Sequence, residues 1–366
     1  MRRFRYIILI LIIILCSNIV YGENLDLSAQ SYILIDSQTG RVLYERNAHR
    51  KMPMASTTKI MTALVALEKG NIDDKVVIKK ESVGVEGSSI YLRDGEILSL
   101  KDMLYGLMLR SGNDAAEAIA IHIGGDLDSF VSLMNKKAQS IGALNTNFAN
   151  PHGLHHDLHY STAYDLALIT KAAFSYDEFA NIVRSKSYVA DREENNYFYN
   201  KNKTLWEYTG GDGVKTGYTM RSGRCLVSSA SKNGMRLIAV SLNAPNWFND
   251  NYKLLDYGFN NYKEFLIYDK GQFMKKTNVI NGNKEFVNLV SENSFFYPLK
   301  DGEREKITVS IDVPSDIQTP IERGDRIGYI NTYFDGQLIN KSNLIAKDAI
   351  RKTNIIERFF SKIRFK

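Results

Sequence analysis

Long hydrophobic runs are scarce in this sequence. The run from Ile7 to Cys16 has ten residues, whereas a helix that spans a bilayer needs about 20. Three arginines precede this run, and small residues follow it around Gly22. A basic start, a short apolar run and small residues at its end are the parts of a secretory signal. We therefore expect residues 1–22 to be a signal peptide and the mature chain to belong to an exported protein.

Cysteine is also rare. Without the signal peptide, Cys225 is the one cysteine left in the chain. An exported protein with a single cysteine cannot form an internal disulfide, so its stability must come from a hydrophobic core. With 366 residues, of which 44% are hydrophobic, the chain can build such a core and is long enough for two domains. The sequence fits a bacterial exported enzyme better than a small disulfide-rich domain.

The body of the chain has little excess charge. The net charge is +6, but the signal segment and residues 347–366 carry the positive excess, which leaves the remainder nearly neutral. A protein that binds nucleic acid spreads its basic residues over a binding face. No nucleic-acid partner is therefore expected.

A serine followed by a lysine three residues later is the first motif that indicates chemistry. Ser56-Thr57-Thr58-Lys59 stands before a helical pattern of apolar residues that stops at Gly70. Residues three apart share a helix face, so the Ser56 hydroxyl and the Lys59 amine would face the same point. The amine can take the serine proton only if burial or a neighbouring cation, such as Lys215, lowers its pKa. Ser229-Ala230-Ser231-Lys232 has the same spacing, and we interpret it as a chance match in a hairpin.

The second motif is Ser111-Gly112-Asn113. It lies between two apolar helical stretches, residues 103–109 and 115–121, and predicts first of all a helix–helix turn. Such a turn would also point the Ser111 hydroxyl and the Asn113 amide into a cleft, where they would serve as a proton relay and a ligand for a substrate backbone.

The third motif, Lys215-Thr216-Gly217, lies on a predicted strand. The expected strands of this region are residues 213–217, 224–230 and 235–242, and a hairpin is expected at 31–36 and 41–45. A strand beside the nucleophile offers backbone N–H groups, an ammonium and a hydroxyl along one edge, which suits an extended peptide with a free carboxylate. Taken alone, the motif would indicate only an exposed edge strand.

Residues 150–159 contain four of the six histidines. His155 and His159 have the spacing of one helix face, but no glutamate stands between them as in H-E-x-x-H, and the proline and glycine of the segment indicate a loop. We expect a solvated loop in which local hydrogen bonds hold His152, and no metal site.

The C-terminal part changes in character twice. Residues 269–347 contain short β-rich runs and turns without a helical pattern, which predicts a small all-β domain. Residues 349–366 are basic, and most of their large apolar residues would fall in one sector of a helix. A helix packed on the β domain is one interpretation, but a basic amphipathic end on an exported protein fits an anchor on an anionic membrane surface better.

With these segments in view, the chain resembles the low-molecular-mass penicillin-binding proteins that are D-alanyl-D-alanine carboxypeptidases. The resemblance rests on the motif segments 55–63, 111–116, 150–154, 159–163 and 212–219. It implies an α/β fold, with a DD-peptidase or β-lactamase-like domain in which helical clusters pack on an antiparallel sheet. A small all-β domain and a C-terminal amphipathic helix would follow. The expected boundaries are 1–22, 23–266, 267–347 and 348–366.

The resemblance also implies roles for the motif residues. Ser56 would be the nucleophile, Lys59 the base and Ser111 the proton relay. The substrate-binding residues would be Asn113, Lys215, Thr216, Gly217 and Tyr218. The backbone N–H groups of Ser56 and Tyr218 would form the oxyanion hole, and no cofactor or metal would be needed. The implied partners are a peptidoglycan stem peptide ending in D-Ala-D-Ala, β-lactam antibiotics and an anionic membrane, at the outer face of the cytoplasmic membrane.

One position departs from the family pattern. Some members have an arginine shortly before the K-T-G motif that assists carboxylate binding, whereas this chain has Asn200-Lys201-Asn202-Lys203. Lys201 or Lys203 would replace it without the two-pronged geometry of a guanidinium, so weaker carboxylate binding is expected.

Three other functions fit parts of the sequence. A serine β-lactamase would share the motifs, although the second domain, the anchor and the lack of an obvious deacylating glutamate argue against it. A metallopeptidase would use the loop from His152 to His159, and its activity would be lost with a chelator. A wall-binding protein without activity would keep the β domain but would neither be acylated nor release D-alanine.

Overall fold

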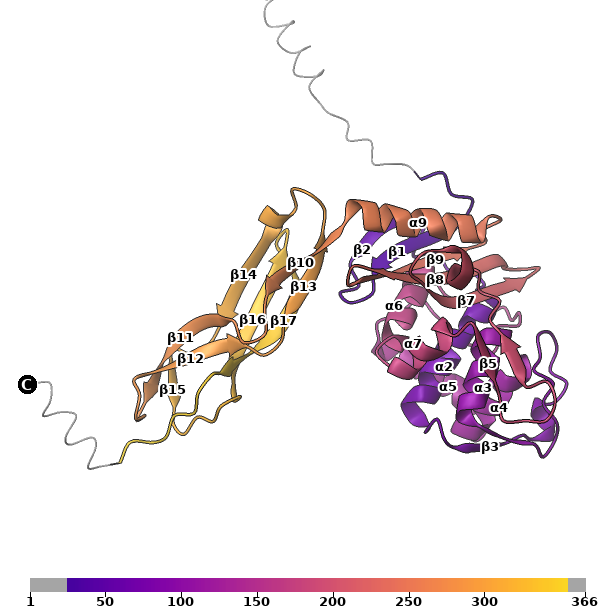
Figure 1. The fold of residues 1–366 in the computed structure, drawn as a ribbon, viewed down its shortest axis with the longest axis horizontal. Coiled ribbons are helices and arrows are strands. Elements are labelled where there is room, and N and C mark those ends of the chain that lie inside the picture. The colour runs from indigo at the N-terminus through magenta and orange to yellow at the C-terminus, as the bar shows by residue number, and fades with distance from the viewer. Residues whose placement is uncertain (1–24, 355–366) are drawn as a thin grey trace, which may run out of the picture.

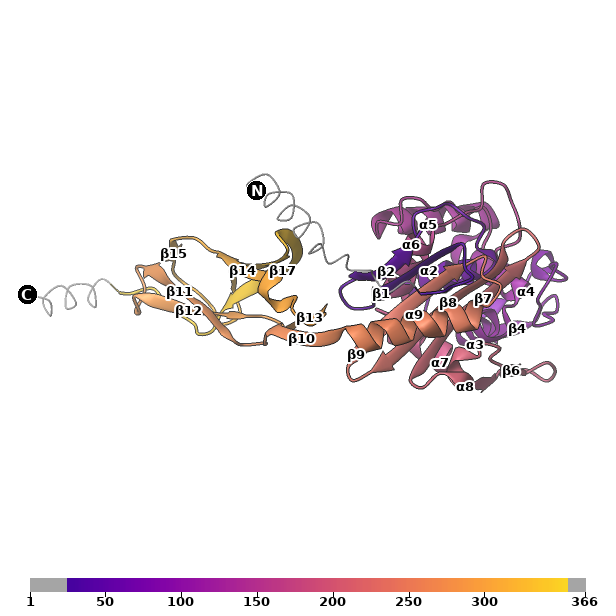
Figure 2. The same ribbon diagram turned by 90° about the horizontal axis from the view of Figure 1, so that it is seen from above.

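The computed structural model of the chain describes residues 25–354. The expected signal peptide, residues 1–22, and residues 355–366 of the expected anchor lie outside this range. The described chain forms a mixed α/β domain and an all-β domain that lie end to end in an elongated molecule (Figures 1 and 2). The expected fold class, an antiparallel sheet with helices followed by a small all-β domain, is confirmed.

A five-stranded antiparallel sheet is the backbone of the first domain. Its strands occur in the order β2-β1-β9-β8-β7. Their bounds are β1 Ser31–Asp36, β2 Val42–Arg46, β7 Gly211–Thr219, β8 Gly223–Lys232 and β9 Met235–Leu242. The expected hairpin and the three expected strands are therefore present, and β7, which carries the K-T-G motif, is an edge strand.

Helices cover both faces of this sheet. α9 (Trp247–Asn261) packs on one face, and α6 (Ala163–Ala173) packs on the other (Figure 1). Because both faces are covered, every residue of β1 is buried, which explains its nearly continuous apolar sequence. The same burial favours β-branched and other apolar residues in β9.

The remaining helices form a cluster around α2 (Lys59–Lys69), whose first eight residues are all buried. The members of this cluster are α3 Leu100–Tyr105, the π-helical turn η3 Gly106–Arg110, α4 Asn113–Gly124, α5 Leu127–Ser140 and α7 Asp177–Arg184. Short elements complete the domain: η1 Ala55–Thr58, β3 Lys75–Val77, η2 Lys80–Ser82, β4 Ile97–Ser99, β5 Ser187–Val189, β6 Tyr197–Tyr199 and α8 Thr204–Glu207.

The second domain consists of a two-stranded and a six-stranded sheet. β10 (Lys263–Tyr268) pairs with β13 (Phe295–Leu299), and the larger sheet has the order β14-β16-β17-β12-β11-β15. The bounds of its strands are β11 Phe273–Ile280, β12 Phe286–Ser291, β14 Ile307–Asp312, β15 Asp316–Gln318, β16 Arg326–Phe334 and β17 Gln337–Ala346, with the turn η4 at Arg304–Lys306. β10 begins ahead of the expected boundary at residue 267.

The end of the described chain differs from the sequence expectation. Residues 349–354 are not helical, and Ile350 and Lys352 form isolated bridges with Ile321 and Gly282. The Ile350 side chain is 1% exposed and belongs to the core of the β domain. The expectation that the anchor helix starts at residue 348 is therefore wrong, because this stretch is needed to close the β domain.

Arg41, in the turn between β1 and β2, links the two domains. Its Nη2 atom lies 2.8 Å from Oε1 of Glu303. Its guanidinium also lies 4.3 Å from the ring centre of Phe334 and 5.1 Å from that of Tyr297. The cation is thus held by a carboxylate and by aromatic faces of the second domain.

Candidate active site

Ser56 lies in a tight turn rather than in the first turn of an α-helix. The 3₁₀ turn η1 precedes α2, and the Thr57 and Thr58 hydroxyls donate hydrogen bonds to the carbonyls of Met54 and Ala55 at 2.6 and 2.7 Å. Ala55 has φ +48°, a left-handed conformation that is unfavourable for a residue with a side chain. The residue before the predicted nucleophile is therefore strained, and its surroundings must hold it in place.

The Asn150–Leu154 loop provides part of this support. Gly153 has φ +96°, and a Cβ atom at this position would lie 2.0 Å from the Ala55 carbonyl oxygen and 2.9 Å from the Ser56 nitrogen. A side chain there would collide with backbone, so the close approach of the loop to the turn requires glycine. The Asn150 side chain accepts hydrogen bonds from Gly153 N and His152 N, which fixes the loop.

Lys59 is fully buried, and three oxygen atoms surround its amine. Nζ lies 3.2 Å from Ser56 Oγ, 2.6 Å from Asn113 Oδ1 and 2.7 Å from the His152 carbonyl oxygen. Burial lowers the pKa of Lys59 well below its ordinary value, and the positive charge of Lys215 lowers it further, whereas Asp114 opposes the shift. Both effects disfavour the ammonium form.

The arrangement around Lys59 suits a neutral amine that acts as a base. A neutral amine has two N–H donors and one lone pair. The Asn113 and His152 oxygens can accept the two N–H groups, which leaves the lone pair for the Ser56 hydroxyl. The geometry thus supports proton transfer from Ser56 to Lys59.

The expected turn between helices is present at Ser111-Gly112-Asn113. Ser111 is half-buried with φ +65°, and Asn113 is the first residue of α4. The Asn113 side chain is fixed at both ends, because Nδ2 donates to the Glu86 carbonyl at 2.5 Å while Oδ1 accepts from Lys59. Ser111 belongs to the same turn and precedes Asn113 by two residues in the chain.

The K-T-G strand lies against the nucleophile turn. A Cβ atom on Gly217 would lie 3.0 Å from Ser56 N and 3.1 Å from Thr57 N, so glycine permits this close approach. Thr216 is half-buried and Tyr218 is 63% exposed, whereas Lys215 is buried and donates a hydrogen bond to the Thr216 carbonyl at 2.9 Å. The structure therefore brings this third motif to Ser56, and Lys215 is not a lysine on an exposed edge.

Lys215 titrates near neutral pH. Burial, followed by the positive charge of Lys201, lowers the pKa of Lys215 to about 7. Of the two lysines considered as replacements for the family arginine, Lys203 forms an ion pair with Glu207 at 3.1 Å. Lys201 is exposed and is the one whose charge acts on Lys215.

The histidine loop is less solvated than expected, because His152 and His159 are buried. His159 Nε2 lies 2.8 Å from the Thr58 hydroxyl, and its Nδ1 accepts a hydrogen bond from Ala149 N. Burial, and then the neighbouring positive charges, lower the pKa of His159 to about 3, so the ring is neutral at pH 7. The expected local hydrogen bonds to His152 are present, since Leu154 N donates to its Nδ1 at 3.1 Å. Among residues 25–354, no group of three His, Cys, Asp or Glu side chains is placed to hold a metal ion.

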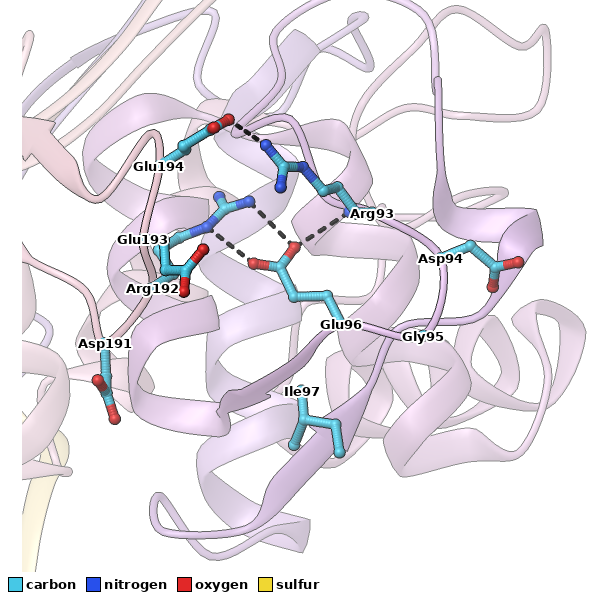
Figure 3. A pocket seen from close by; sticks show the side chains of 9 residues that line it. All are labelled: Arg93, Asp94, Gly95, Glu96, Ile97, Asp191, Arg192, Glu193 and Glu194. Atoms are coloured by element: carbon cyan, nitrogen blue, oxygen red, sulfur yellow. Dashed lines mark hydrogen bonds and ion pairs between the residues drawn. The ribbon is translucent and has the colours of Figure 1, made fainter.

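Figure 3 shows a separate hollow lined by residues 93–97 and 191–194. Arg192 faces Glu96, with Nε and Oε1 at 2.9 Å, and Arg93 pairs with Glu194. Arg192 also donates a hydrogen bond to the Ile90 carbonyl at 2.7 Å. These charges are already paired with one another, and they tie the segment of residues 90–96 to the segment of residues 192–194.

Sequence reasoning missed four contributors to this geometry: the strained residue Ala55, the His152 carbonyl, the close approach of Gly153 and the Glu86 carbonyl. The segment 150–154 was recognised as part of a motif, but nothing in its composition indicated which backbone atom would contact Lys59. The contacts of Lys59 and Asn113 join residues that are far apart in the chain and depend on the tertiary fold.

Comparisons with known proteins show which family the chain resembles. Residues 19–246 match the family model described as D-alanyl-D-alanine carboxypeptidase, and residues 262–352 match the one described as penicillin-binding protein 5, C-terminal domain. The D-alanyl-D-alanine carboxypeptidase DacF of Bacillus subtilis is 36% identical over 90% of this chain and 87% of its own length. DacC of Escherichia coli is 31% identical over 94% and 90%, respectively.

Solved structures are also similar. Penicillin-binding protein 5 from Haemophilus influenzae has a TM-score of 0.74 and 32% identity, over 90% of this chain and all of that chain. Penicillin-binding protein 6B from Escherichia coli has a TM-score of 0.69 and 28% identity, over 90% and 98%. These similarities cover both domains. The chain therefore belongs to the D-alanyl-D-alanine carboxypeptidase family.

Proposed function

We propose that this protein is a serine-type carboxypeptidase that removes the terminal D-alanine from peptidoglycan stem peptides through an acyl-enzyme. The observation that carries the proposal is the position of the buried Lys59 amine, between Ser56 Oγ and the fixed oxygens of Asn113 and His152. A base held in this way activates a serine at neutral pH without a metal ion.

In the first half of the reaction, Ser56 Oγ attacks the carbonyl carbon of the penultimate D-alanine while Lys59 takes its proton. The backbone N–H groups of Ser56 and Tyr218 stabilise the oxyanion. The C–N bond then breaks, and the proton reaches the leaving amine through Ser111. In the second half, water attacks the acyl carbon while Lys59 takes a proton from the water. The bond to Ser56 Oγ then breaks, and Lys59 returns this proton to Ser56 Oγ.

The substrate lies along β7 as an extended peptide. Asn113 contacts its backbone amide, and the strand from Lys215 to Tyr218 offers backbone groups on the other side. Lys215 and the Thr216 hydroxyl bind the terminal carboxylate. We assign the role of the family arginine to Lys201 because its charge acts on Lys215, whereas Lys203 is paired with Glu207.

The same site accounts for binding of β-lactam antibiotics, which carry a carboxylate and a reactive amide in similar positions. We place the enzyme outside the cytoplasmic membrane, held at its anionic surface by the basic C-terminal residues. Among residues 25–354, no helix has both the length and the apolar character required to cross a membrane.

The direct test of the function is release of D-alanine from a soluble peptide ending in D-Ala-D-Ala. We expect release by the purified enzyme, complete inhibition by penicillin, full activity in EDTA, and loss of activity in Ser56→Ala. Activity that disappears with EDTA would instead indicate a metallopeptidase. An enzyme that hydrolyses penicillin rapidly but leaves the peptide intact would be a β-lactamase.

Lys201→Ala tests the assignment of the second cation. At pH 6, where Lys215 is protonated, we expect the KM for the peptide to rise about threefold with little change in kcat, because an exposed charge pair contributes modestly. The lost charge should also raise the pKa of Lys215, so the alkaline fall of kcat/KM should move to higher pH. Lys203→Ala is the matched control. Equal effects of the two variants would argue against a specific role for Lys201.

A further inference from the structure

His152 and Glu117 form a largely buried pair of side chains that has no part in the proton transfers described above. His152 Nε2 lies 3.3 Å from Glu117 Oε1, and the two side chains are 8% and 14% exposed. His152 is also the residue whose carbonyl accepts a hydrogen bond from Lys59 at 2.7 Å. This histidine thus contacts the predicted base through its backbone and a carboxylate through its ring.

The hydrogen bond that the His152 ring accepts defines its tautomer. Nδ1 accepts a hydrogen bond from Leu154 N at 3.1 Å, so this nitrogen carries no proton. The proton of the neutral ring is therefore on Nε2, which faces the Glu117 carboxylate. With both nitrogens engaged, the ring cannot turn without losing a partner, and the backbone of His152 is restrained with it.

Helix α4 carries both residues that position the oxygen atoms around the Lys59 amine. Asn113 and Glu117 are four residues apart and lie on one face of the helix. Asn113 Oδ1 contacts the amine directly at 2.6 Å, and Glu117 reaches it through His152. The directions of the two N–H groups of a neutral Lys59, and hence of its lone pair, depend on these two oxygens.

We propose that Glu117 is a positioning residue for acylation: it orients the His152 imidazole and thereby holds the His152 carbonyl against the Lys59 amine. The inference rests on the proposed function. Small misplacements of reacting groups cost up to about 10²-fold in rate. Glu117 acts on the base only through His152, so its loss should disturb the orientation of the base only in part. We therefore expect the acylation rate constant to fall about tenfold and the affinity for the ligand to stay unchanged.

The test uses two variants of Glu117 in the full mature chain and a fluorescent penicillin. Stopped-flow kinetics separates the dissociation constant of the non-covalent complex from the acylation rate constant. Glu117→Ala is expected to lower the acylation rate constant about tenfold with an unchanged dissociation constant. Glu117→Gln keeps an acceptor for the Nε2 proton and is expected to restore most of the rate. Glu68→Ala, which removes an ion-paired glutamate from α2, is the matched control and should acylate at the parent rate.

A second measurement does not depend on activity. Nitrogen NMR of the His152 imidazole is expected to show the Nε2–H tautomer in all three proteins, because Leu154 N still donates to Nδ1. The Nε2 resonance is expected to coincide in the parent and in Glu117→Gln, and to shift in Glu117→Ala, where Nε2–H loses the acceptor at position 117. Glu117→Ala that acylates at the parent rate, or Glu117→Gln that is as slow as Glu117→Ala, would overturn the proposal. So would an unchanged His152 spectrum in Glu117→Ala. A parent enzyme that is not acylated at all would instead overturn the proposed function.

Discussion

Replacement of Lys59 by arginine is expected to lower the rate of acylation by penicillin by about three orders of magnitude. Arginine resembles lysine in its long, unbranched stem, but it cannot release its proton at any pH where the protein is folded. Lys59, in contrast, is buried next to the charge of Lys215, and both effects lower its pKa well below the ordinary value. The variant should therefore retain the fold and lose the base. Acylation by a labelled penicillin, measured over time, checks the rate.

Lys69→Arg is the matched control for this variant because Lys69 lies at the exposed end of the same helix. It should acylate at the parent rate. Thermal unfolding and circular dichroism of Lys59→Arg show whether the core tolerates the guanidinium. Acylation of a folded Lys59→Arg enzyme at near the parent rate would exclude Lys59 as the base.

Removal of residues 355–366 is expected to release the enzyme from anionic vesicles without loss of activity. These residues contain five large isoleucine and phenylalanine side chains before the final Phe365, together with four basic residues and Glu357. Burial of one large apolar side chain contributes about 1.5–3 kcal/mol, and a basic residue near anionic lipid contributes about 1 kcal/mol. Their loss should reduce the vesicle-bound fraction at least tenfold in a sedimentation assay, whereas D-alanine release from a soluble peptide should stay unchanged.

The structure determines where this cut must be made. A deletion from Ala349 would also remove Ile350, which is buried in the β domain and pairs with Ile321. We expect this longer deletion to lower the melting temperature of the β domain, and the deletion from Ile355 to leave it unchanged. If the shorter deletion still sediments with anionic vesicles, the membrane contact lies elsewhere in the protein.

The parts of the fold that depend on local sequence pattern were predictable. The hairpin of β1 and β2 follows from alternating residues around a glycine-containing turn, and β7 to β9 follow from apolar runs separated by turn residues. The turn at Gly112 follows from a glycine between two apolar helices.

The parts that depend on tertiary contacts were not predictable from pattern alone. The His152 carbonyl is a backbone atom, and every residue type has one, so no side chain marks it as a partner of Lys59. Burial of His159 depends on Thr58, about a hundred residues earlier in the chain. The basic C-terminal pattern suggested a helix from residue 348, but an apolar residue such as Ile350 fits a β core equally well. In the structure Ile350 packs in the core of the β domain.

The central claim is that Ser56 is the nucleophile that Lys59 activates. The most direct measurement is peptide mass spectrometry of the enzyme after reaction with penicillin in EDTA, to locate the covalent adduct. We expect one penicilloyl group per molecule, on the peptide that contains Ser56, and none on Ser56→Ala. An adduct on another serine, such as Ser111 or Ser229, or no adduct on an enzyme that still releases D-alanine, would contradict this claim.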